Sequence, residues 1–227
     1  MTLRACRAVA AVTMLLAASI AQARSPDLQR GREIAANGSA EGAQACAACH
    51  KLDGAGDTSG AFPRLTRQAG FYLYKQLKDY QAGLRDSQIM VPIAQRLSED
   101  EMQDVSGYYA STSAPFVPPS PGDNRSIQYG GVLSALGSAE KNVPACVNCH
   151  GQAGAGIPPS FPYLAGQFAR YTRDQLAAWK DGSRRNDPLN VMRDIAARLG
   201  SDDVAALAEY FAHAWPPDGS NQARIGR

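Results

Sequence analysis

The chain has few of the residues that build a disulfide scaffold, and it lacks a long apolar run. Its 227 residues include five cysteines and three histidines, and after residue 23 no stretch approaches 18 consecutive apolar residues. Basic and acidic side chains are nearly balanced, at 23 and 21. Since there is no basic excess, nucleic acid is not expected as a partner. The sequence predicts a soluble or loosely membrane-associated protein of one medium or two small domains.

The N-terminus has the pattern of a secretory signal peptide. Residues 1–7 carry two arginines and no acid, residues 8–20 are apolar, and residues 21–23 read Ala-Gln-Ala, a small-residue cleavage signal. Cleavage after residue 23 would remove Cys6 and leave 21 basic against 21 acidic residues. We therefore expect export to the periplasm, and a retained N-terminal anchor is the alternative.

The remaining cysteines stand in two matching hexapeptides. Residues 45–50 read A-C-A-A-C-H, and residues 145–150 read A-C-V-N-C-H. An exported protein with four cysteines ordinarily suggests disulfides. Here each pair is followed at once by a histidine, which suggests a different chemistry.

The chain is an internal duplication with an offset near 100 residues. M-x-x-I-A-x-R-L occurs at 90–97 and 192–199, F-P-x-L occurs at 62–65 and 161–164, and Gly31 is matched to Gly131. Ordered matches over most of each half indicate two copies of one small domain. We predict domains at 24–114 and 125–227, joined by a proline-rich linker at 115–124.

Each copy is predicted to be all-α, because neither shows a sustained alternating strand pattern. We expect a first helix before each cysteine pair and a middle helix at about 70–84 and 167–180. An amphipathic last helix should begin at Ser98, with a capping box, and at Ser201. Glycine- and proline-rich loops at 54–63 and 151–162 follow the histidines. A domain of only a few short helices buries little apolar surface. Each copy is therefore expected to need a bound group at the centre of its core.

C-x-x-C-H is the attachment sequence of c-type haem. Two thiols one helical turn apart can add to the porphyrin vinyl groups, and the next residue offers an imidazole to the iron. A redox C-x-x-C would be expected in a βαβ context, and a single zinc site of four cysteines would leave both histidines unexplained. We predict two covalently bound haem c groups, with these attachment residues and proximal ligands: Cys46, Cys49 and His50; Cys146, Cys149 and His150.

The sixth iron ligand is sought among three methionines and one histidine. Met90 and Met192 lie 40 and 42 residues after the proximal histidines and begin the repeated segment. We predict that they bind the two irons, with packing in the core as the alternative. Met102 lies on an apolar helix face and is expected in the core. His213 is expected at a helix surface.

The surroundings of the proximal histidines can also be predicted. A ligating histidine usually donates its other N–H to a carbonyl or carboxylate. The carbonyls of Pro63 and Pro162 are the candidate acceptors, and ordinary turn prolines are the alternative. Aromatic side chains expected along the haem crevices, or simply in the core, are Tyr72, Tyr80, Tyr171 and Trp179.

Together these features resemble the class I cytochrome c domain: C-x-x-C-H near the start, a proline loop, a methionine about 40 residues on and a closing amphipathic helix. Two such domains behind a signal peptide resemble the dihaem cytochrome c4 family. The segment N-D-P-L-N-V-M-R-D-I-A-A-R-L at 186–199 is especially similar to that family. The first copy departs from the pattern, because Met90 is followed by Val-Pro and not by Arg-Asp. The resemblance covers essentially the whole mature chain. It implies two all-α domains packed near the haem propionates.

The resemblance also implies electron transfer in the periplasm. Its donor would be a quinol-oxidising complex or a dehydrogenase, and its acceptor a terminal oxidase or another redox protein. Histidine–methionine ligation leaves no open iron site, so we expect an electron-transfer protein of the respiratory chain and no enzyme. The main alternative is an electron-accepting subunit of a periplasmic dehydrogenase complex, of the flavocytochrome c type. A dihaem peroxidase, with one five-coordinate iron, is the other alternative.

Overall fold

The computed structural model describes residues 24–57, 59, 62–120 and 122–215, and the predicted signal peptide lies outside these residues. The described part of the chain is helical, with isolated β-bridges and no sheet. None of its helices is long and apolar enough to cross a membrane.

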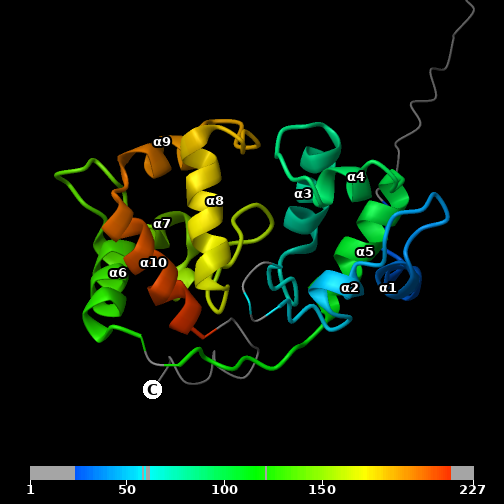
Figure 1. The fold of residues 1–227 in the computed structure, drawn as a ribbon, viewed down its shortest axis with the longest axis horizontal. Helices are drawn as coiled ribbons and strands as arrows, with labels where there is room; N and C mark the ends of the chain where they lie inside the picture. The colour runs from blue at the N-terminus through cyan, green and yellow to red at the C-terminus, as the bar shows by residue number, and fades with distance from the viewer. Residues whose placement is uncertain (1–23, 58, 60–61, 121, 216–227) are drawn as a thin grey trace, which may run out of the picture.

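The helices fall into two sets with the same order (Figure 1). We call the described residues from 24 to 114 the N-terminal unit and the described residues from 124 onward the C-terminal unit. The N-terminal unit contains α1 (Leu28–Asn37), α2 (Ala47–His50), α3 (Gly70–Gln81), α4 (Met90–Ala94) and α5 (Glu99–Ser111). The second set is α6 (Asn124–Leu136), α7 (Val147–His150), the 3-10 turn η1 (Gln152–Gly154), α8 (Ala169–Asp181), α9 (Val191–Arg198) and α10 (Ser201–His213).

The sequence accounts for where several helices begin and end. Ser98 and Glu101 form the predicted capping box of α5: the Ser98 side chain accepts from the Glu101 amide, and the Glu101 carboxylate accepts from the Ser98 amide. The first and middle helices are confirmed, with ends that differ by a few residues. α3 stops at Gln81, short of the predicted residue 84, because Gly83 takes a left-handed φ of 68°.

The first and last helices of each unit cross in close contact. A Cβ atom on Gly31 would lie 2.1 Å from the Asp104 carbonyl oxygen, and one on Gly130 would lie 2.1 Å from the Ala206 carbonyl oxygen. Gly31 therefore corresponds to Gly130, and its match to Gly131 was wrong by one residue. Gly131 faces the side chain of Tyr210 instead, so two adjacent glycines made the sequence register ambiguous.

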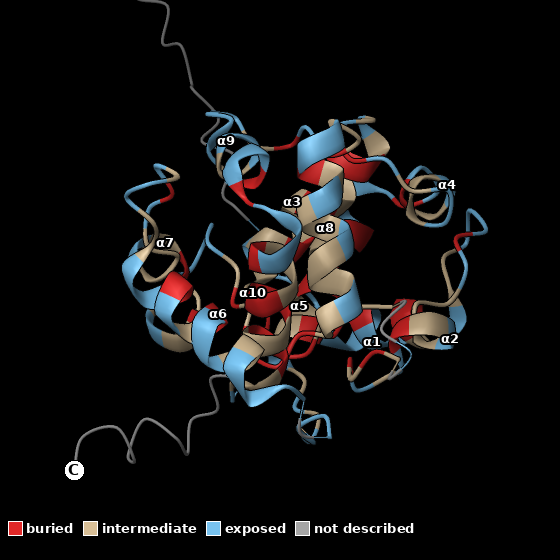
Figure 2. Cartoon of the chain, turned by 60° about the vertical axis from the view of Figure 1, so that its left-hand side comes forward, coloured by how far each residue is buried: buried red, intermediate tan, exposed pale blue. Residues whose placement is uncertain are grey.

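Each unit has its own small core, to which α1 and α5, or α6 and α10, contribute. Figure 2 shows helices that are buried on one face and exposed on the other. Met102 is fully buried in the N-terminal core, as predicted. The residues buried in the C-terminal core are Leu133, Val143, Leu199, Leu207 and Phe211.

The two units are joined by paired side-chain and backbone hydrogen bonds. The Gln68 amide donates to the Tyr163 carbonyl (3.1 Å) and accepts from the Tyr163 amide (3.2 Å). The Gln167 amide does the same with the backbone of Arg64, at 3.0 Å in both directions. The junction therefore has an approximate two-fold symmetry, which follows from the duplication. The predicted linker leads to α6, which begins at Asn124; the domain boundaries stay a prediction.

One difference between the copies leaves a cavity at this junction. Phe168 precedes α8 with φ −59° and ψ 132°, and its ring contacts Gly56 of the other unit. Ala69 precedes α3 with nearly the same backbone angles, −55° and 125°. Its small side chain lines a cavity of about 440 Å³, together with Arg67 and Phe161. Phe168 fills the space between the units beside α8, whereas Ala69 leaves the equivalent space beside α3 open.

Candidate functional site

Each C-x-x-C-H sequence forms a single helical turn. Cys46 and Cys146 are the N-cap residues of α2 and α7. Their backbone carbonyls accept hydrogen bonds from the backbone amides of His50 and His150, both at 2.8 Å. All four cysteines are half-buried and unpaired. The two thiols of each pair, three residues apart, lie one turn apart. The disulfide alternative is therefore wrong.

The zinc and thiol-redox alternatives also disagree with the structure. In the described residues no group of three or more histidine, cysteine or acidic side chains could hold a metal ion. Burial raises the pKa of Cys46 to about 11, so this thiol lacks the lowered pKa that is typical of a redox-active cysteine. These thiols are available for covalent attachment to another group.

The two histidines are held in the same way. His50 and His150 are buried, and their Nδ1 atoms lie 3.0 Å from the Pro63 oxygen and 2.9 Å from the Pro162 oxygen. Both predicted carbonyl acceptors are thus confirmed. Because a carbonyl can only accept, Nδ1 carries the proton and Nε2 keeps its lone pair for a metal.

Electrostatics favours the same neutral form of the ring. Burial lowers the pKa of His50, and the carbonyl of Pro63 offsets this in part. Burial also lowers the pKa of His150, and the nearby positive charge of Arg184 adds to this effect. Both imidazoles are therefore neutral at pH 7, as an iron ligand must be.

The loop after each histidine brings the proline carbonyl into place. The carbonyl of His50 accepts from the Gly56 amide (3.0 Å), and the carbonyl of His150 accepts from Gly156 (2.6 Å). Gly156 has a φ of 80°, and a Cβ there would lie 2.7 Å from the Tyr163 amide nitrogen. Only glycine fits such a turn without strain. The glycine-rich loops thus set the ring orientation of the histidines.

The predicted distal ligands stand at matching places in the two units. Met90 is the first residue of α4, and its amide donates to the Ser87 hydroxyl (3.0 Å). Met192 is the second residue of α9, and its amide donates to the Asp187 carboxylate. Both methionines are half-buried. A capped loop therefore leads into each methionine, and their binding to iron stays a prediction.

His213 occupies a different environment. It ends α10, and its ring nitrogens lie 2.8 Å from the Glu209 carbonyl and 3.3 Å from the Ser120 carbonyl. It is half-buried and contacts the segment between the units. The partly exposed ring agrees with the expected position at a helix surface.

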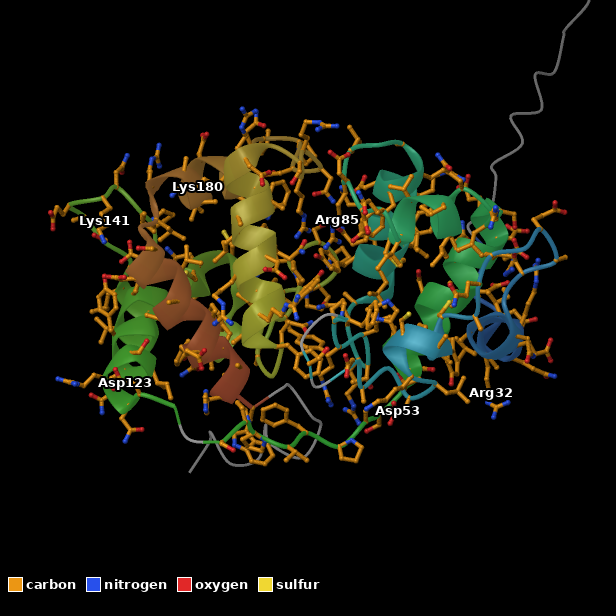
Figure 3. The ribbon with its side chains drawn as sticks, viewed as in Figure 1. Arg32, Asp53, Arg85, Asp123, Lys141 and Lys180 are labelled. Atoms are coloured by element: carbon orange, nitrogen blue, oxygen red, sulfur yellow. The ribbon has the colours of Figure 1, made fainter. Side chains whose placement is uncertain are left out.

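The four predicted aromatic residues gather around two arginines that the sequence reasoning missed. Arg85 stacks on Tyr80, 4.7 Å from the ring centroid, and Arg184 stacks on Trp179 at 4.4 Å. Figure 3 shows Arg85 at the junction of the two units. The sequence does contain a pattern that could have identified these arginines, because Gly83-x-Arg85 is repeated as Gly182-x-Arg184. The tyrosines Tyr171 and Tyr72 accept hydrogen bonds from these arginines.

These residues fit haem c in both units. Each unit offers two unpaired thiols on one turn, an adjacent buried imidazole with a free Nε2, and a methionine that follows a capped loop. Bound haem would supply one-electron exchange at its iron. The protein's own residues hold the group, orient the imidazole and keep it neutral.

A helical protein with two such sites is a two-haem c-type cytochrome. A family model described as Cytochrome c matches residues 28–113 and 140–215, and the chain belongs to this family. The haems are bound covalently through the two cysteine pairs. The chain is an electron-transfer protein and no enzyme, so the peroxidase alternative is not supported.

Within this family the chain is similar to cytochrome c4, as predicted. It is 35% identical to cytochrome c4 of Pseudomonas aeruginosa over 179 residues, which cover 78% of this chain and 87% of that one. A crystal structure of reduced cytochrome c4 from Pseudomonas stutzeri superposes with a TM-score of 0.73 at 31% identity, covering 83% and 99% of the two chains.

Two further matches have a more specific name. The chain is 41% identical over 206 residues to a protein of Stutzerimonas stutzeri named thiosulfate dehydrogenase electron acceptor, covering 90% of this chain and 93% of that one. A structure of thiosulfate dehydrogenase (TsdBA) from Marichromatium purpuratum superposes with a TM-score of 0.78 at 38% identity. That match covers 86% of this chain but only 42% of the longer chain.

Proposed function

We propose that this protein is an exported dihaem cytochrome that accepts electrons from a periplasmic dehydrogenase for thiosulfate. It then passes them on to a terminal oxidase or another acceptor. The observation that carries the proposal is the 41% identity over 90% of the chain to a protein named for this role. A second such protein, from Thiomonas intermedia, is 35% identical over 170 residues, which cover 75% of this chain and 78% of that one.

The longer thiosulfate dehydrogenase chain supports the same partner. Its matching part has the fold of this protein and is continuous with a larger remainder that has no counterpart here. We infer that the acceptor and the enzyme work in contact, because one polypeptide holds both in that relative.

The site suits repeated one-electron transfer. The Pro63 and Pro162 carbonyls fix the tautomer and orientation of the proximal imidazoles, so the ligand does not have to rearrange when the charge of the iron changes. Met90 and Met192, as distal ligands, would close the sixth position and raise the reduction potential. Two units with one haem each can take up two electrons from a substrate oxidation in successive steps.

The alternative is a general carrier that a quinol-oxidising complex reduces, as the similarity to cytochrome c4 also allows. Rapid-mixing absorbance separates the two donors. Oxidised holoprotein is mixed with thiosulfate and the thiosulfate dehydrogenase of Stutzerimonas stutzeri, or with a quinol and a quinol-oxidising complex. Thiosulfate without the enzyme is the control.

The proposal predicts that the dehydrogenase reduces both haems at least ten-fold faster than the quinol-oxidising complex at equal concentration. Faster reduction by the quinol-oxidising complex would favour the general carrier. The periplasmic location rests on the N-terminal pattern of residues 1–23. Cell fractionation followed by N-terminal sequencing tests it, with a mature chain that begins near Arg24 as the expected result.

A further inference from the structure

Each proximal histidine is bonded to a peptide group whose other end reaches the opposite unit. The Nδ1–H of His50 donates to the Pro63 carbonyl at 3.0 Å. The Arg64 amide belongs to the same peptide group, and it donates to the Gln167 Oε1 atom of the C-terminal unit at 3.0 Å. One planar peptide group thus lies between an imidazole of one unit and a glutamine of the other.

The second histidine has the same arrangement in the opposite direction. The Nδ1–H of His150 donates to the Pro162 carbonyl at 2.9 Å. The Tyr163 amide of that peptide group donates to the Gln68 Oε1 atom of the N-terminal unit at 3.2 Å. Gln68 and Gln167 each stand five residues after the proximal-loop proline of their own unit. Each glutamine nevertheless bonds to the proline peptide group of the other unit.

The orientation of both glutamine amides is fixed by their partners. The two Oε1 atoms accept a second N–H group, from Ala69 and from Phe168, each at 3.1 Å. The Nε2 atoms donate to the carbonyls of Tyr163 (3.1 Å) and Arg64 (3.0 Å). An amide oxygen can only accept and an amide nitrogen can only donate. The oxygen therefore faces the proximal peptide group in both units.

These hydrogen bonds lie away from water. Gln68 and Gln167 are 5% and 7% exposed, and the residues whose amides donate to them, Tyr163 and Arg64, are 4% and 7% exposed. In a buried chain of hydrogen bonds each bond strengthens the next, by about 10–30%. An acceptor on the N–H of a peptide group makes its carbonyl oxygen more negative. That carbonyl then accepts more strongly from the imidazole.

We propose that Gln68 and Gln167 are positioning residues for the proximal histidines of the opposite units, so that each glutamine lowers the reduction potential of the other unit's haem. A stronger hydrogen bond from Nδ1–H makes the imidazole a more basic ligand. A more basic ligand favours ferric over ferrous iron, because the ferric ion carries the greater positive charge. The inference concerns the haem sites and holds whichever dehydrogenase or oxidase is the partner.

The test is a redox titration of the holoprotein and its variants, followed by proton NMR. The Nδ1–H protons of His50 and His150 give separate signals in the reduced protein, so each titration step is assigned to a unit. Gln68→Met keeps the volume of the side chain and removes the acceptor. It should make reduction of the haem in the C-terminal unit about two-fold more favourable, which is about 18 mV at 59 mV per ten-fold change. Gln167→Met should do the same to the haem of the N-terminal unit.

A second substitution separates hydrogen bonding from packing. Gln68→Glu places a carboxylate opposite the Tyr163 amide, and a charged acceptor binds more strongly than a neutral one. This variant should therefore lower the potential that Gln68→Met raises. Exchange of the His150 Nδ1–H with heavy water should be faster in Gln68→Met and slower in Gln68→Glu. A merely structural role predicts instead that both substitutions loosen the junction and shift the potential in the same direction.

Arg185→Gln is the matched control. Arg185 crosses the same junction, but its side chain donates to the carbonyls of Gly83 (2.7 Å) and Gly182 (3.0 Å), so both potentials should stay in place. The proposal is overturned if the two methionine variants change both equilibria by less than about 1.3-fold. It is also overturned if each variant shifts the haem of its own unit, if both haems move equally, or if Arg185→Gln has the same effect.

Discussion

The crossing of the first and last helices makes a prediction that can be worked out from distances. In the variant Gly31→Ala the new Cβ would lie 2.1 Å from the Asp104 carbonyl oxygen, where real Cβ atoms keep at least about 3.0 Å. Helix α1 must therefore move away from α5 by about 1 Å, and this loosens the packing around Ile34 and Val105. Overpacking of this kind costs about 1–3 kcal/mol. The better helix propensity of alanine recovers about 0.5–1 kcal/mol, so we expect a net loss of about 1–2 kcal/mol.

Guanidinium unfolding of the holoprotein, followed by far-ultraviolet circular dichroism, measures this loss. Gly130→Ala should lose a similar amount of stability, because its Cβ would lie 2.1 Å from the Ala206 carbonyl oxygen. Gly70→Ala is the control: its Cβ would meet the Ala110 side chain at an ordinary 3.5 Å. The packing argument is refuted if Gly31→Ala is as stable as Gly70→Ala.

Three further changes test other parts of the structure by the same unfolding assay. Ser98→Ala removes the cap of α5 and should cost about 1 kcal/mol; an unchanged midpoint would show that the capping box contributes nothing. Ala69→Phe should fill the cavity at the junction as Phe168 does on the other side, and stabilise by about 1–2 kcal/mol; a loss would mean that the two sides are not equivalent. Burial raises the pKa of Asp203, but hydrogen bonds from Lys141, Tyr129 and the Gly200 amide outweigh it and lower that pKa. The carboxylate therefore stabilises the fold above its ordinary pKa of 3.8, and this is lost as pH falls through the lowered value. Asp203→Asn should be less stable at pH 7 and less sensitive to acid; an unchanged acid dependence would contradict this.

The chemistry of the site could be predicted from the sequence because it depends on local spacing. Two cysteines and a histidine within five residues form one turn in both copies, and the proline carbonyls follow the histidines by 13 and 12 residues. The duplication then gave the same prediction twice. His50 with Pro63 and His150 with Pro162 were therefore found before the fold was known.

The junction between the units could not be predicted in this way. Arg85 and Arg184 look like surface residues near the end of a helix until the two copies pack against each other, and periodicity within one copy says nothing about that packing. The alignment of Gly31 with the second copy was ambiguous for a related reason, because the neighbouring residues Gly130 and Gly131 fit the sequence pattern equally well. Only the close approach to Ala206 distinguishes them.

The measurement that tests the central claim most directly is haem stoichiometry combined with an optical redox titration of the exported protein. The account predicts two covalently bound haems per chain. Both should be low-spin, both should show the far-red band of methionine bound to ferric iron, and both should have high potentials. A single haem per chain would contradict the two-haem account, and a haem that is high-spin or lacks the methionine band would contradict the assignment of Met90 or Met192.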